Sequence, residues 1–211
     1  MSELIQQIND LIQKRTILEH PFYEMWSAGE LKLESLAGYS KEYFQLVKAV
    51  PEFMKPLINQ ADESLASELH ENMLEEVEHI EPWIHFASSL GVDQNELNHY
   101  TGTDKTRQAV TILNDLVDTS FESGVCAMYT FEKEIPHISE VKLEGLKEFY
   151  DITSDHATEY FKLHTEADIR HVASWRKPLE RVVDEKQMLQ VANKSLDAQH
   201  LLLDACKDTY C

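Results

Sequence analysis

Apolar residues recur every three to four positions along most of the chain, which is the spacing of amphipathic α-helices. In the first such stretch Leu4, Ile5, Ile8, Leu11 and Ile12 share one face. This pattern predicts a helix over residues 3–17. It is followed by a short aromatic helix that starts at Pro21 and stops before Gly29, because proline suits a first turn and glycine a helix end.

The same periodicity predicts further helices across the rest of the sequence. They cover residues 33–50, 62–90 with a kink near Pro82, 103–135, 139–150, 155–177 and 184–206. We expect Pro51 and Pro56 to break or kink the chain after the second of the long helices. Residues 93–97 look like a short turn and 98–103 like a loop. No segment alternates as a strand does, so the prediction is an all-α single domain, residues 1–211, of seven or eight helices, with the last few residues disordered.

Composition narrows the possible functions. Asp and Glu number 38 against 19 Lys and Arg, a formal charge of −19, which disfavours nucleic acids and anionic membranes as partners. No apolar run is long enough to span a bilayer, and the first residues do not resemble a signal peptide. Three scattered cysteines, Cys126, Cys206 and Cys211, fit free thiols in a reducing cytoplasm, where we expect the protein.

One octapeptide, residues 164–171, carries the strongest chemical signal. His164, Asp168 and His171 stand at i, i+4 and i+7, so a continuous helix would place all three on one face. Imidazole and carboxylate groups on one face form a ligand set for Zn, Mn or Fe. Two other interpretations of the octapeptide are a polar helix face exposed to solvent and buried histidines that are simply hydrogen-bonded. A metal site therefore needs matching ligands elsewhere in the chain.

Two further segments supply matching ligands. Glu76-x-x-His79 has the pair spacing found on metal-binding helices of bundles, although Glu75 competes with Glu76 for this role. Glu132 lies among aromatic residues, where an unpaired charge is costly, and Glu134 is its competitor. The candidates are Glu76, His79, Glu132, His164, Asp168 and His171. Three carboxylates would nearly balance two divalent cations, which suits two first-row transition ions with positions left open for dioxygen or water.

Several runs of this sequence resemble the family of the chlamydial protein associating with death domains (CADD) and its bacterial relatives. The resemblance extends from about Leu4 to His200. Its most specific piece is residues 166–171, preceded by His164, and the other runs are residues 19–31, 79–83 and 129–136. The family has the haem-oxygenase-like helical fold, with thiaminase II and pyrroloquinoline-quinone synthase among its relatives. The resemblance therefore implies that fold.

The resemblance also implies a reaction and the same six ligands. Family members resemble dimetal oxygenases rather than haem proteins, so we expect Fe/Fe or Fe/Mn and no haem. They make 4-aminobenzoate for folate synthesis, apparently from one of their own tyrosines. Tyr23 matches that tyrosine, and Lys142 falls where the family has a lysine proposed as the amine donor. Dioxygen and an external reductant are the expected partners, and we expect a homodimer.

Two departures separate this chain from the chlamydial protein. Phe131 stands beside Glu132 where that protein has a second tyrosine, so a redox role of that phenol could not operate here. The segment between Glu76 and His79 is four residues shorter, about one helical turn. The shortening preserves the helix face or shifts the ligand to Glu75.

Three other functions compete with this interpretation. A thiaminase-like hydrolase would need an activated nucleophile, for which Cys126 is the candidate. A cofactorless quinone synthase would need many basic groups around its acidic quinone, and this acidic chain has few of them. A death-domain-type interaction module would need no metal at all, so metal content separates it from the dimetal oxygenase.

Overall fold

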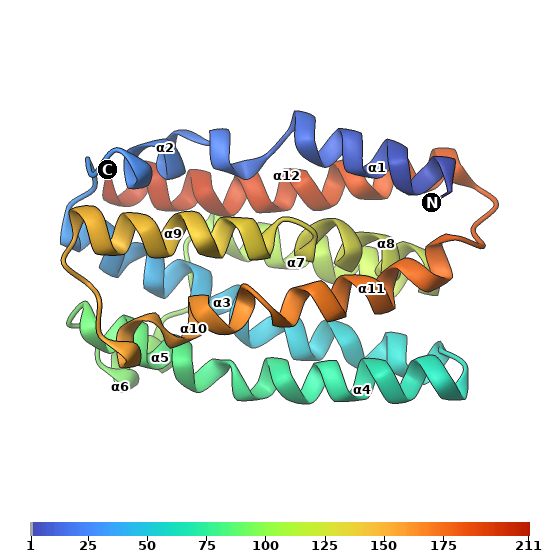
Figure 1. Ribbon diagram of the computed structural model, residues 1–211, viewed down its shortest axis with the longest axis horizontal. Helices are drawn as coiled ribbons and strands as arrows, with labels where there is room; N and C mark the ends of the chain where they lie inside the picture. The colour runs from blue at the N-terminus through green and yellow to red at the C-terminus, as the bar shows by residue number, and fades with distance from the viewer. Residues whose placement is uncertain (1) are drawn as a thin grey trace.

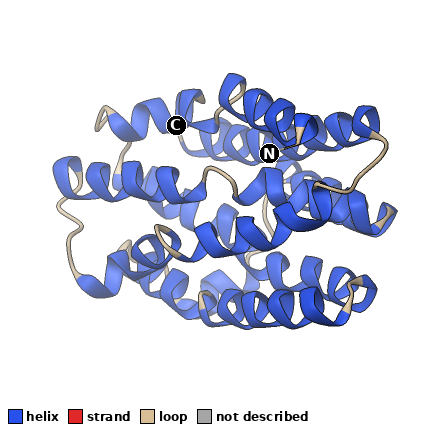
Figure 2. Cartoon of the chain, turned by 45° about the vertical axis from the view of Figure 1, so that its right-hand side comes forward, coloured by secondary structure: helices blue, strands red, loops and turns tan. Residues whose placement is uncertain are grey.

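The computed structural model describes residues 2–211, and these residues form only helices and the loops between them (Figures 1 and 2). The all-α prediction is confirmed. The helices in chain order are α1 (Glu3–Lys14), the 3-10 helix η1 (Ile17–Glu19), α2 (Pro21–Ser27), α3 (Leu33–Gln60), α4 (Glu63–Glu78), α5 (Ile80–Ser89), α6 (Gln94–His99), α7 (Asp104–Thr119), α8 (Phe121–Glu132), α9 (Ile135–Phe149), α10 (Asp155–His164), α11 (Ala167–Leu179) and α12 (Glu185–Tyr210). The described part of the chain therefore has twelve α-helical segments, because several expected long helices are interrupted.

The longest helix, α3, packs against α4, α5, α7, α8 and α12. It runs through Pro51 and Pro56, so the expected break there is wrong. Each proline removes one backbone hydrogen bond, but Phe53, Met54 and Leu57 continue the buried face beyond the first proline. The packing of that face keeps the segment helical despite the two missing donors.

Three other boundaries differ from the sequence prediction. The helix predicted over 103–135 is divided at Ser120, which has extended backbone angles and caps α8 through its side chain. Pro136 lies in the first turn of α9 and does not precede it, a position where proline needs no hydrogen-bond partner. The C-terminal residues belong to α12 up to Tyr210, whose carbonyl accepts a hydrogen bond from Ser35 Oγ at 2.6 Å, so the disorder predicted there is wrong.

Two interruptions fall beside the candidate ligands. The helix predicted over 62–90 ends at Glu78, and α5 begins at Ile80, because Pro82 lacks the N–H that would reach back to Glu78. The helix predicted over 155–177 stops at His164 and restarts at Ala167. In the turn, Thr165 Oγ1 donates to the Lys162 carbonyl at 2.8 Å. His164, Asp168 and His171 therefore do not share one helix.

The core of the bundle is rich in aromatic side chains at one end. Tyr23, Trp26 and Tyr39 are buried and meet edge to face. The ring of Tyr210 lies against Gly38, on the same helix as Tyr39, where any Cβ would collide with it. Among the described residues, no helix combines the length and the apolar character needed to cross a bilayer. Tyr23 and Trp26 belong to α2 and Tyr39 belongs to α3, so their contacts hold these two helices together. Trp26 also donates from its indole Nε1 to the Lys142 carbonyl of α9.

Candidate metal centre

The six side chains predicted as ligands converge between α4, α8, α10 and α11, and all are at most 6 % exposed. Glu76 lies in the last turn of α4, His79 in the break after it, Glu132 at the end of α8, His164 at the end of α10, and Asp168 and His171 in the first turns of α11. The two helix breaks described above each supply a ligand at their edge. The bundle thus brings together residues that are up to 95 positions apart, as His171 and Glu76 are.

The Glu76 carboxylate occupies the middle of this group. Its oxygens lie 3.2 Å from His171 Nδ1, 3.7 Å from His79 Nδ1 and 3.9 Å from His164 Nε2. Two sets of potential ligand atoms result, each within a 4.8 Å span: Glu76 with His79 and His164, and Glu76 with Asp168 and His171. The geometry offers two adjacent cation positions that share one carboxylate. Glu132 belongs to neither set.

Several polar atoms of the group have no hydrogen-bond partner although they are buried. They are both carboxylate oxygens of Asp168, Oε1 of Glu132, and Nδ1 of His79 and of His171. A buried polar atom without a partner costs about 1–3 kcal/mol. The two imidazole nitrogens contact Glu76 only as ion pairs, at 3.7 and 3.2 Å, and the three carboxylate oxygens accept no hydrogen bond, so the penalty is large unless a cation satisfies these atoms. The residues therefore fit bound metal ions.

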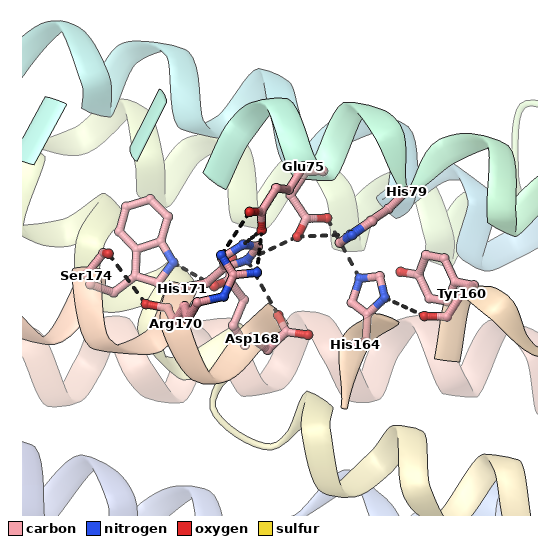
Figure 3. A network of polar contacts seen from close by, with 11 residues as sticks. Glu75, His79, Tyr160, His164, Asp168, Arg170, His171 and Ser174 are labelled. Carbon is pink, nitrogen blue, oxygen red and sulfur yellow. Dashed lines mark hydrogen bonds and ion pairs between the residues drawn. The ribbon is translucent and has the colours of Figure 1, made fainter. Parts of the chain in front are cut away.

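Hydrogen bonds from outside the group fix how two of its histidines point (Figure 3). His164 Nδ1 lies 2.7 Å from the Tyr160 carbonyl, and His171 Nε2 lies 3.0 Å from Glu75 Oε2. In each ring this leaves the second nitrogen facing Glu76. Outer partners of this kind orient ligating histidines in metal proteins.

Glu75 and Glu76 have different surroundings, which bears on the choice between them. Glu75 is half-buried and accepts two hydrogen bonds from Arg170, at 2.8 and 3.1 Å. It contacts the group only through the outer nitrogen of His171. Glu76 is buried and faces three imidazoles. The structure thus brings Glu76 into the group and leaves Glu75 as an outer partner.

The charges of the group are strongly perturbed. Burial lowers the pKa of His171, but the carboxylates of Glu76, Glu132 and Asp168 outweigh burial and raise it to about 10. Burial raises the pKa of Glu132 to about 8 and that of Asp168 well above its usual range. The three imidazoles hold the pKa of Glu76 below its usual value despite burial. Without a cation the group must bind protons, which is the behaviour of ligands that lack their metal.

Trp175 is a contact that the sequence analysis missed. Its indole Nε1 donates to Glu132 Oε2 at 2.6 Å and leaves Oε1 facing the group. The signal was present, because Trp175 follows His171 by four residues and Asp168 by seven, the spacing of one helix face.

Tyr23 and Lys142 form a second buried cluster. Tyr43 and Tyr160 lie between this cluster and the carboxylate–histidine group. Lys142 is 4 % exposed, and its Nζ donates to Tyr39 Oη at 2.6 Å and lies 4.9 Å from the centre of the Tyr23 ring. The hydroxyls of Tyr39 and Tyr23 are 3.3 Å apart. Lys142 has no carboxylate partner among the described residues, and burial lowers its pKa to about 7.

Two small cavities lie next to each other, one beside each cluster. One is bordered by Glu76, Glu132, His164 and Asp168, and the other by Tyr23 and Lys142. Tyr43, Phe131 and Tyr160 border both cavities, so a single layer of side chains separates the carboxylate–histidine group from Tyr23. Phe131 thus stands between the clusters.

Cys126, the nucleophile of the thiaminase-like alternative, lies away from both cavities. Its Sγ is fully buried and donates to the Met188 carbonyl at 3.3 Å. Burial raises the pKa of this thiol to about 12. Because the thiolate is the reactive form of cysteine, nothing at this position favours nucleophilic catalysis.

Comparison with known proteins agrees with this geometry. The model of a family described as iron-containing redox enzymes matches residues 37–200. The chain belongs to this family. A curated relative from Nitrosomonas europaea, named 4-aminobenzoate synthase, is 32 % identical over 98 % of this chain and 92 % of its own. A relative of the same name from Chlamydia muridarum is 30 % identical over 95 % and 89 %.

Solved structures with low sequence identity to this chain share its fold. A TenA homologue from Pseudomonas syringae superposes with a TM-score of 0.85 over 98 % of this chain and 93 % of its own, at 15 % identity. A CADD-like protein from Nostoc punctiforme gives a TM-score of 0.78 over 99 % and 97 %, at 17 % identity. The expected haem-oxygenase-like fold and the resemblance to the CADD family are confirmed.

Proposed function

We propose that this iron-containing redox enzyme is a 4-aminobenzoate synthase that takes the product's ring from its own Tyr23 and its nitrogen from Lys142. The observation that carries the proposal is the buried pairing of an amine without a counter-ion and a tyrosine ring, 4.9 Å apart. The names of the curated relatives point to the same product. Both groups lie one side-chain layer from a set of potential metal ligands.

The proposed ligands are Glu76, His79, Glu132, His164, Asp168 and His171. Two transition-metal ions bound there, Fe/Fe or Fe/Mn, would supply the activation of dioxygen, with electrons from an external reductant. The role of the protein is to hold this set in a dry environment. Glu75, Trp175 and the Tyr160 carbonyl orient three of the proposed ligands through hydrogen bonds.

Tyr23 supplies all the carbon that the product needs. Its ring and Cβ become the ring and carboxylate of 4-aminobenzoate, so the Tyr23 Cα–Cβ bond and the Lys142 Cε–Nζ bond must both break, the phenol oxygen must leave as nitrogen takes its place, and Cβ must be oxidised to the carboxylate. Dioxygen is the oxidant for this loss of electrons. Burial of Tyr23 keeps bulk water from the ring and fixes its position against α3 and α9.

Lys142 has the properties of a nitrogen donor. An amine acts as a nucleophile only when it is neutral, and burial brings the pKa of Lys142 to about 7. Tyr39 holds the amine through its hydroxyl, which also lies beside the Tyr23 hydroxyl. The amine is thus held close to the carbon that must exchange oxygen for nitrogen.

Isotope labelling tests both assignments. Protein carrying carbon-13 in all tyrosine rings and nitrogen-15 in all lysine side chains is loaded with iron, or with iron and manganese, and exposed to dioxygen and reductant. We expect 4-aminobenzoate that contains both labels, with no added aromatic compound. The yield should not exceed one molecule per chain, because the ring is not replaced. Mass spectrometry of product and protein measures both quantities.

Tyr23→Phe is the decisive variant, since it removes the phenol and leaves the proposed ligands untouched. It should bind metal as the wild type does and make no product. Tyr150→Phe is a matched control, because it removes a phenol that lies outside both cavities. Labelled product from Tyr23→Phe would assign the ring to another tyrosine. Many turnovers that require an added aromatic compound would make the protein a conventional oxygenase.

A further inference from the structure

A surface groove lies directly outside the proposed metal ligands, between the end of α4 and the turn that joins α10 to α11. Glu75 and His79 form its inner wall, and Glu78, Glu159 and Glu166 stand around its opening. His79 is buried and its Nδ1 lies 3.7 Å from Glu76, so the inner wall of the groove is also the edge of the ligand group. A second groove at the opposite end of the bundle, beside Lys177 and Arg181, includes none of the six proposed ligands.

We infer that this groove is the route by which metal ions enter and leave the buried centre, and that the Arg170–Glu75 ion pair closes its inner end. The inference rests on the metal centre proposed above. It adds a path and a closing contact, which involve residues outside the ligand set.

The charge of the groove selects for cations. Five carboxylates line it, and Lys162 and Arg170 pair with Asp155 and Glu75. Within residues 2–211, Glu78 and Glu166 have no ion-pair partner, and the only such partner of Glu159 is His85, whose Nδ1 lies 3.5 Å from its carboxylate. Grooves lined by one sign of charge concentrate ions of the opposite sign and raise their association rate about 10- to 1,000-fold. A divalent cation would thus be drawn toward Glu75 and His79.

The Arg170–Glu75 ion pair connects the protein surface to the proposed ligand His171 through consecutive hydrogen bonds. The Arg170 guanidinium, which is largely exposed, binds both oxygens of Glu75. One of these oxygens also accepts from His171 Nε2 at 3.0 Å, and His171 is fully buried (Figure 3). While Arg170 holds Glu75, this carboxylate stays against His171. Release of Arg170 would free Glu75 to accept an incoming ion and pass it to His79 and Glu76.

The rate of metal uptake tests the route. Metal-free full-length protein is mixed with Co²⁺ alone in a stopped-flow instrument, and the visible absorption of bound cobalt is followed at low and at high salt. The groove variant is Glu78→Gln, Glu159→Gln and Glu166→Gln together. The matched control removes the same charge from exposed positions on α7 and α9: Asp115→Asn, Glu144→Gln and Glu148→Gln.

We expect the groove variant to take up cobalt about tenfold more slowly at low salt, because three attracting charges are lost. The difference should shrink at 1 M salt, where charges are screened within about 3 Å. The final cobalt content per chain should equal that of the wild type, and the control should load at the wild-type rate. Equal rates for the two triple variants would overturn the route. Absence of tight cobalt binding in every protein, the wild type included, would instead reject the metal centre itself.

The closing contact is tested by metal release. Arg170→Gln should lose cobalt to excess EDTA about twofold to fivefold faster than the wild type, the range of factors that an exposed ion pair represents. Arg176→Gln is the control, since it removes the same charge from the same helix and breaks only the pair with Glu180. Circular dichroism confirms that both variants are folded. Equal release rates from the two variants would show that Arg170 does not close the groove.

Discussion

Replacing Lys142 by methionine should change the stability of the protein in a pH-dependent way. The ordinary pKa of this side chain is 10.5, and burial lowers it to about 7 in the folded protein. Between these two values the unfolded chain binds a proton that the folded chain does not, so stability rises with pH across this window. Below pH 7 the folded protein must bury an ammonium ion that has no carboxylate partner. Methionine has a similar length and no charge.

The expected magnitude follows from the two pKa values. The wild type should carry a penalty of about 5 kcal/mol at pH 6 and about 2 kcal/mol at pH 9 from this one residue. Loss of the hydrogen bond to Tyr39 costs the variant roughly 1 kcal/mol at either pH. Lys142→Met should therefore be more stable than the wild type at pH 6, by an amount that falls by about 3 kcal/mol at pH 9.

Urea unfolding of the metal-free proteins, followed by circular dichroism at several pH values from 6 to 9, measures this difference. Lys147→Met is the control, because Lys147 is exposed on the same helix. Its difference from the wild type should stay small and constant with pH. A constant difference for Lys142→Met would refute the reasoning, since it would mean that the amine keeps its ordinary pKa in the folded protein.

Three further predictions concern the ligands and the packing around them. His171→Ala should fold but bind less metal, measured by elemental analysis, because a proposed ligand is lost. Glu78→Ala should keep its full metal content, because the Glu78 side chain is exposed and lies outside the group. Trp175→Phe should lower metal affinity about tenfold in a chelator competition, because the carboxylate at the end of α8 loses its orienting donor; unchanged affinity would make the indole a packing residue only. Gly38→Ala should lower the melting temperature by several degrees in a thermal scan, because the new methyl displaces the Tyr210 ring.

The fold could be predicted because helical periodicity is a local signal, but the interruptions depend on more than local sequence. Proline marks the break at His79, yet Pro51 and Pro56 lie inside α3 where packing on both sides outweighs the lost donors. Nothing in Thr165-Glu166 announces the turn between α10 and α11, since neither residue is a strong helix breaker. Such outcomes are decided by contacts between helices.

The candidate site could be predicted in its residue types and only partly in its geometry. Spacing at i, i+4 and i+7 identified His164, Asp168 and His171, and the turn between them is short enough that they still converge. The sequence does not distinguish Glu75 from Glu76 as the ligand, because two adjacent carboxylates on one helix differ only in the neighbours that tertiary packing gives them. The contact between Arg170 and Glu75 joins residues 95 positions apart, a distance over which periodicity carries no information.

The burial of Tyr23 has a consequence for the lifetime of the molecule. Removing a large aromatic side chain from a packed core costs about 3–5 kcal/mol, and the whole stability of a domain is commonly about 5–15 kcal/mol. A chain that has given up its Tyr23 ring would keep a void between α2, α3 and α9 and would unfold far more often than a fresh one. Unfolded chains are what cellular proteases remove. Under the proposed reaction, chains that have reacted would be degraded faster than fresh chains because they are less stable. The supply of product would then follow the rate at which new chains are synthesised.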